Sequence, residues 1–180
     1  MSSGQPGPAA PAAARPLWED GLLTGLVGAG LVAAWFLLLD CIRGAPFFTP
    51  SLLGSVVFDH NTTPGPVVIS TKNVFAYSGL HVILFLVVGW GLAWMFREFE
   101  LHPQFGLIYL LLYGLFEAII FALELSMVPG VLGLLGTWAV AVGNVLSAVG
   151  MFVFLLRRHP RAIQRLVEGW HDRPHADLTG

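Results

Sequence analysis

Four apolar stretches, each long enough to cross a lipid bilayer, constrain this chain more than any other feature. They cover residues 21–42, 75–96, 105–127 and 132–156. A helix rises 1.5 Å per residue, so about 20 apolar residues span a hydrocarbon core about 30 Å thick. Charged residues make up only 11% of the chain, whereas a soluble domain carries roughly 25%. The pattern predicts an all-α integral membrane protein, built as a four-helix bundle.

The segments outside residues 21–156 differ in composition from this transmembrane domain. Residues 1–20 begin with a run of Ala, Pro, Gly and Ser, which is typical of a disordered leader. In the tail, residues 157–180, apolar residues recur at helical spacing from Ile163 to Trp170 opposite basic residues, which predicts an amphipathic helix lying on the membrane. The residues expected to contact the lipid surface are Arg157, Arg158, Arg161, Arg165 and Trp170.

The positive charges predict the orientation. Arginines lie in the leader, at position 97 after the second stretch, and throughout the tail, whereas the opposite side carries only Arg43 and Lys72. The positive-inside rule therefore puts both termini in the cytoplasm. The long connection between residues 43 and 72 then faces outside, where Thr49-Pro50 favours the start of a short interfacial helix over residues 51–58.

A small set of polar residues lies within the apolar stretches. Ionisable groups are costly at such depth, so each is a functional-site hypothesis. The candidate intramembrane polar or ion site contains Asp40, Tyr77, His81, Tyr113, Glu117, Glu124 and Asn144. Glu117 and Glu124 share one helix face because they are seven residues apart, and Tyr77 and His81 share another because they are four apart.

If those two faces meet, the bundle contains a polar track from the outer surface to the middle of the membrane. Two glutamates beside a histidine suit proton sharing, or a divalent cation held by one nitrogen and two or three oxygens. Structural interpretations compete with this one. Asp40 also fits an interfacial residue paired with Arg43, His81 fits a structural hydrogen bond, and Asn144 fits a contact between helices.

Small residues recur every four positions in three of the stretches and predict close helix packing. In lipid no hydrophobic drive joins helices, so backbone approach across small residues provides the association. The expected packing residues are Gly21, Gly25, Ala29, Gly114, Ala118 and Gly143. A homodimer through the first ridge is an alternative use of the same pattern.

The chain carries no pattern of a known catalytic centre. Neither glutamate of the third stretch precedes a histidine at the spacing of a di-iron bundle, and P-loop, HExxH and GxSxG motifs are absent. Because the chain has a single cysteine, Cys41, it cannot contain a CxxC motif, and its net charge of −2 gives no indication of nucleic-acid binding. We expect a protein that is not an enzyme and has no cofactor, with a divalent metal as the one open option.

One run of the sequence resembles a known group of proteins. It extends from the glycine-rich first stretch ending in Asp40, through Arg43-Gly44-Ala45-Pro46-Phe47-Phe48-Thr49-Pro50, to Leu53-Gly54. This run resembles small four-span bacterial membrane proteins whose activity is uncharacterised. The resemblance implies a location in the bacterial inner membrane, and it transfers no catalytic residue.

Three functions fit these features in decreasing order. The first is a non-enzymatic accessory or structural subunit, in contact with the lipid bilayer and with a membrane-protein partner or further copies of itself. The second is a proton- or cation-handling protein that uses Glu117, Glu124 and His81. The third, an intramembrane redox or quinone enzyme, depends only on His81 and the tryptophans.

Overall fold

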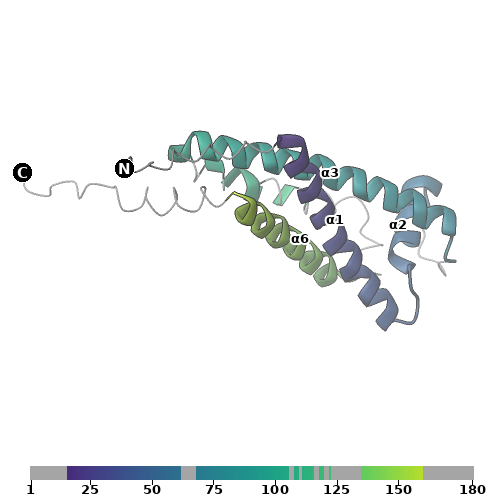
Figure 1. The fold of residues 1–180 in the computed structure, drawn as a ribbon. Coiled ribbons are helices and arrows are strands. Elements are labelled where there is room, and N and C mark those ends of the chain that lie inside the picture. The colour runs from purple at the N-terminus through teal and green to yellow at the C-terminus, as the bar shows by residue number, and fades with distance from the viewer. Residues whose placement is uncertain are drawn as a thin grey trace, which may run out of the picture.

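The computed structural model describes residues 16–61, 68–105, 108–109, 111–115, 118–119, 122 and 135–159. Within these ranges the protein is helical and contains no strand (Figure 1). The elements are α1 (Leu17–Ile42), α2 (Phe48–Asp59), α3 (Thr71–Leu101), the 3-10 turn η1 (Pro103–Phe105) and α6 (Thr137–Arg158).

Three of these helices are long and apolar enough to cross a membrane. They are α1, α3 and α6, with 26, 31 and 22 residues and mean hydropathies of 2.2, 2.0 and 2.2. They coincide with the stretches predicted at 21–42, 75–96 and 132–156, although α1 and α3 begin four residues earlier and α6 begins five residues later. Most of the stretch at 105–127, residues 1–15 of the leader and the tail beyond residue 159 lie outside the described residues. Residues 17–20, which the sequence assigned to the leader, form the first turn of α1.

Glycine backbones form the contact between α1 and α3. A Cβ atom added to Gly89 of α3 would lie 2.6 Å from the Cα atom of Gly25 in α1, and one added to Gly21 would lie 2.8 Å from the Cα atom of Trp90. No side chain can occupy such a space without moving a backbone. The helices therefore approach as closely as their main chains allow, which maximises van der Waals contact in lipid.

The helix α1 also packs against α6, so it contacts both other long helices (Figure 1). The small residue Gly143 of α6 faces the rings of Trp35 and Phe36. The indole Nε1 of Trp35 donates a hydrogen bond to the carbonyl oxygen of Ala139 at 2.8 Å. Small residues on α6 thus leave room for the aromatic side chains of α1.

Two apolar clusters are buried at different levels of the bundle. One joins the end of α1 to α2 and to the start of α6 through Leu52, Leu135 and Val140, with Phe36 packed against them. The other joins α3 to α6; its buried members are Leu92, Ala93, Phe96, Met151 and Leu155. Together they hold α6 against the rest of the bundle at both of its ends.

The short helix α2 begins three residues earlier than the 51–58 that the sequence predicts. Its N-cap is Phe47, which adopts a left-handed backbone with φ of 67°. Thr49 therefore lies in the first turn of α2, where its backbone N–H needs a partner from outside the helix. That partner is supplied by the end of α1.

Candidate functional site

Asp40, the last acidic residue of α1, is fully buried and bonds to α2. One carboxylate oxygen accepts from the backbone N–H of Thr49 at 2.7 Å, and the other accepts from the Thr49 hydroxyl at 2.8 Å. The next residue, Pro50, has no N–H to satisfy. The negative charge of Asp40 lies at the positive end of the α2 dipole. Asp40 thus acts as the N-terminal cap of a helix to which it does not belong.

His81 is half-buried between α3 and α1. Its Nε2 atom lies 3.3 Å from the carbonyl oxygen of Ala29. The rings of Tyr77 and Phe85 lie on either side along α3, with centroids 6.1 and 4.7 Å from that of His81. The expected structural partner of His81 was a glutamate or a tyrosine, whereas the partner in the described residues is the main-chain carbonyl of Ala29.

The remaining members of the predicted polar set fall in different places. Tyr113 packs against the cluster around Leu92 and Met151. Asn144 is half-buried on α6, where its backbone carbonyl oxygen accepts a hydrogen bond from the Ser147 hydroxyl. Glu117 and Glu124 lie outside the described residues. The track that these glutamates were expected to form with His81 is thus not tested by the described helices.

Asp40 and His81 lie at separate levels of the bundle. Asp40 is eleven residues along α1 from Ala29, the residue that His81 contacts. That separation corresponds to about 16 Å of helix. Among the described residues, no group of three or more His, Cys, Asp and Glu side chains is arranged to hold a metal ion.

The predicted packing residues divide into two groups. Gly21, Gly25 and Ala29 are buried, the first two against α3, and Gly143 lies against α1. By contrast, Gly114 and Ala118 are exposed, and a Cβ atom added to Gly114 would meet nothing within 4 Å.

A polar contact that the sequence analysis did not predict joins α2 to the start of α3. Asp59 accepts a hydrogen bond from the Asn73 amide at 2.6 Å and pairs with Lys72 at 3.2 Å. The hydrogen bond from Asn73, followed by that from Lys72, lowers the pKa of Asp59 below its ordinary value. Nearby, the Ser51 hydroxyl accepts from the backbone N–H of Ser70 at 2.9 Å.

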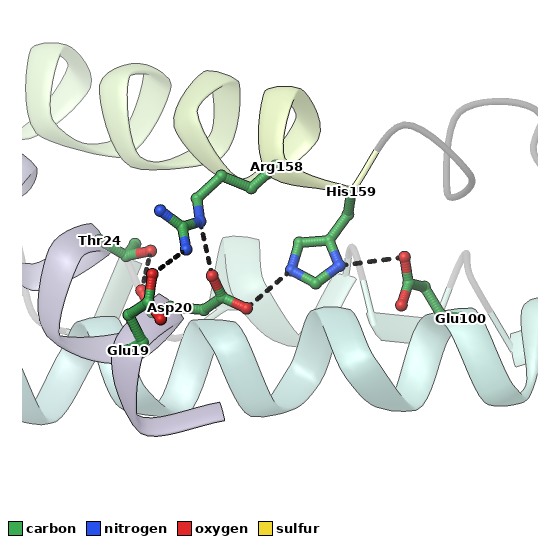
Figure 2. A network of polar contacts seen from close by, with 6 residues as sticks. All are labelled: Glu19, Asp20, Thr24, Glu100, Arg158 and His159. Atoms are coloured by element: carbon green, nitrogen blue, oxygen red, sulfur yellow. Dashed lines mark hydrogen bonds and ion pairs between the residues drawn. The ribbon is translucent and has the colours of Figure 1, made fainter. Parts of the chain in front are cut away.

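The largest polar network among the described residues lies at the opposite end of the bundle, and it too was not predicted from the sequence. Here the first turns of α1 meet the last turns of α3 and α6 (Figure 2). We call it the six-residue cluster; its members are Glu19, Asp20, Thr24, Glu100, Arg158 and His159.

The guanidinium of Arg158 joins α6 to α1. Its Nη2 atom donates to Glu19 at 2.6 Å, and its Nε atom lies 2.6 Å from a carboxylate oxygen of Asp20. Arg158 belonged to the residues expected at the lipid surface, but the side chains of Arg158 and Asp20 are only 17% and 4% exposed. The neighbouring Arg157 is exposed.

His159 joins the same helices to α3. Its Nε2 atom lies 3.3 Å from the second carboxylate oxygen of Asp20, and its Nδ1 atom lies 3.0 Å from Glu100. Figure 2 shows the imidazole between these two carboxylates. The cluster therefore fastens three helix ends to one another.

The two buried aspartates of α1 mark the limits of its apolar part. Asp20 and Asp40 are 2% and 0% exposed, and twenty residues separate them. The corresponding length of helix is about 30 Å, the thickness of a bilayer's hydrocarbon core. The polar networks around them thus lie where the two lipid interfaces would be.

Comparison of the chain with protein families, with curated proteins and with solved structures finds no match in any of the three. By their length and composition, the described helices make this a small integral membrane protein, with three candidate spans within the described part of the chain.

Proposed function

We propose that this protein is a non-enzymatic accessory or structural subunit of a larger membrane complex. The observation that carries the proposal is how the buried polar side chains are used. Asp40 caps α2, His81 contacts the main chain of α1, and Arg158 pairs with two carboxylates of α1. Each joins one helix to another, as is expected of a bundle whose task is to keep its shape.

The proposed bundle has four spans, and the ends of α3 and α6 support the fourth. The helix α3 ends at Glu100, in the six-residue cluster. The helix α6 begins at the other end of the bundle, where Arg43 donates to the carbonyl oxygen of Leu135 at 3.0 Å. The chain between them must return along the bundle, and the 23 residues from 105 to 127 would cover about 34 Å as a helix.

In this arrangement, the start of α1 and the end of α6 lie on the same side of the membrane. By the positive-inside rule, the arginine distribution predicts that this side is the cytoplasm. The short helix α2 then lies at the outer interface. The membrane that fits the sequence resemblance is the bacterial inner membrane.

The exposed side of α3 offers a surface for lipid or for a partner helix. Its apolar residues repeat at helical spacing, and each is more than half exposed: Ile83 59%, Val87 64%, Trp90 58% and Trp94 54%. Large apolar side chains turned outward in this way are suited to a hydrocarbon environment, and two tryptophans add broad flat surfaces for a neighbouring helix.

Purification from the source membrane in mild detergent tests the proposal. We expect a stoichiometric complex whose other members mass spectrometry identifies. The variants Val87→Trp on α3 and Val145→Trp on α6 then locate the contact with the partner protein. Both valine side chains are exposed, so neither change alters packing inside the bundle. Recovery of the chain only as a free monomer would contradict the proposal.

A free monomer would instead favour the alternative, a proton- or cation-handling protein that uses Glu117, Glu124 and His81. For that function, Glu117→Gln should abolish proton or cation flux into liposomes that contain the purified protein. Flux equal to that of the wild type would remove the alternative.

A further inference from the structure

Large apolar side chains are exposed where α1, α2 and α3 meet, at the end of the bundle opposite the six-residue cluster (Figure 1). They come from the last residue of α1, from the two ends of α2, and from the start of α3 and the chain just before it. We call this set the apolar rim; its members are Ile42, Phe47, Val57, Phe58, Val68 and Phe75. Single exposed apolar residues are ordinary, but several on elements that contact one another mark an interaction surface.

The helix α2 is apolar on its exposed side as well as on its packed side. Leu52 is buried against the start of α6, whereas Val57 and Phe58 are each 43% exposed. No charged residue occurs in α2 before Asp59, its last. A surface helix in water carries polar residues opposite its apolar face, and a helix that is apolar on all sides has apolar surroundings. The exposed side of α2 therefore fits an apolar environment.

Hydrogen bonds hold α2 at the level where the long helices end. Its first turn is bonded to Asp40 of α1 through Thr49, and its last residue, Asp59, accepts a hydrogen bond from Asn73 near the start of α3. Asp40 lies about 30 Å along α1 from Asp20, which is the thickness of a hydrocarbon core. The helix α2 is thus attached at the boundary between acyl chains and lipid headgroups.

We propose that the apolar rim is a lipid-binding surface, which inserts into the boundary between acyl chains and headgroups at this end of the bundle. The rim continues the exposed apolar sides of two candidate spans. Ile42 ends the helix on which Leu37 and Leu38 are exposed, and on α3 the exposed residue Phe75 is followed by Ile83. Apolar side chains of an interfacial helix enter this boundary by about 5–10 Å. The lipid contact does not depend on the accessory role proposed above.

Collision measurements on the spin-labelled full-length protein in phosphatidylcholine liposomes test the proposal. The single native cysteine, Cys41, is replaced with serine, and Phe58→Cys or Phe75→Cys then carries a nitroxide label. Oxygen is apolar and concentrates among acyl chains, whereas a nickel chelate stays in water, so the ratio of the two collision rates reports the depth of the label. Ile83→Cys is the reference within the hydrocarbon and Lys72→Cys the reference in water, because both native side chains are exposed.

We expect the oxygen-to-chelate ratio at positions 58 and 75 to be closer to that of Ile83→Cys than to that of Lys72→Cys. The two rim positions lie on different helices, so one remains measurable if the other variant does not fold. A ratio as low as that of Lys72→Cys would show that the rim faces water and would overturn the proposal. Labels that neither reagent reaches would overturn it too, because the rim would then pack against a second copy of the chain.

Discussion

Both carboxylate oxygens of Asp40 accept hydrogen bonds from Thr49, one from its backbone N–H at 2.7 Å and one from its hydroxyl at 2.8 Å. An aspartate at the C-terminal end of a helix opposes the helix dipole, so its position on α1 is unfavourable by itself. The same charge is favourable at the start of α2. A hydrogen bond from the Ala45 N–H to the Asp40 carbonyl oxygen at 2.9 Å closes the turn between the two helices. Asp40 therefore lies at the end of α1 and also caps the start of α2.

Replacing Asp40 with alanine should therefore destabilise the protein. The substitution leaves the two Thr49 donors buried without acceptors, and each unsatisfied group costs about 1–3 kcal/mol. Thr49→Ser retains both donors and should change stability little. SDS unfolding in mixed micelles measures both variants. Equal stability of Asp40→Ala and Thr49→Ser would show that the cap contributes nothing.

Gly89 and Gly91 offer a matched test of the contact between α1 and α3. A Cβ atom at Gly89 would collide with the α1 backbone, whereas one at Gly91 would meet nothing within 4 Å. Overpacking typically costs about 1–3 kcal/mol, so Gly89→Ala should lower the free energy of unfolding by that amount. Gly91→Ala should leave it unchanged or raise it by up to about 1 kcal/mol, because alanine favours a helix. The same effect from both variants would mean that α1 and α3 do not meet at Gly89.

Apolar length was sufficient to predict where the long helices of the described chain lie. Hydrophobicity over twenty residues is a strong signal because the bilayer requires it. The spacing of Gly21 and Gly25 also pointed to a helix contact. What spacing could not supply was the partner, Gly89 of α3, whose one small neighbour at four-residue spacing is Ala93.

The polar contacts were harder to predict because they join residues far apart in the sequence. Arg158 and Glu19 are 139 positions apart, and each lies at the end of an apolar stretch where a solvent-exposed charge is equally common. One signal was available in the sequence. In the predicted topology, helix ends that carry opposite charges lie on the same side of the membrane. For Asp40, the sequence suggested Arg43 as a partner, whereas the donors that its carboxylate binds belong to Thr49, nine residues away.

The two adjacent arginines at the end of α6 should behave differently. Arg158 is held by Glu19 and Asp20, whereas Arg157 is exposed. Arg158→Gln leaves the buried Asp20 carboxylate with less compensating positive charge and should lower the free energy of unfolding by up to about 3 kcal/mol. Arg157→Gln should cost less than about 0.5 kcal/mol, as for other surface changes. Parallel SDS titrations give the difference, and a larger loss for Arg157→Gln would contradict the described cluster.

Acid should weaken the contact between α2 and α3 through Asp59. Hydrogen bonds from Asn73 and then Lys72 lower the pKa of Asp59 below 3.8 in the folded protein, so the folded state favours the carboxylate more than the unfolded state does. This contribution to stability is present at neutral pH and is lost as the pH falls through the folded-state pKa.

The variant Asp59→Asn should therefore be less stable than the wild type at neutral pH, and the two should converge in acid below the folded-state pKa of Asp59. Lys72→Gln retains the bond from Asn73, the larger of the two causes, so its deficit at neutral pH should be smaller than that of Asp59→Asn. SDS unfolding midpoints of the three proteins, measured from neutral pH into acid, provide the comparison. A difference between wild type and Asp59→Asn that persists in acid would assign the effect to packing rather than to the carboxylate charge.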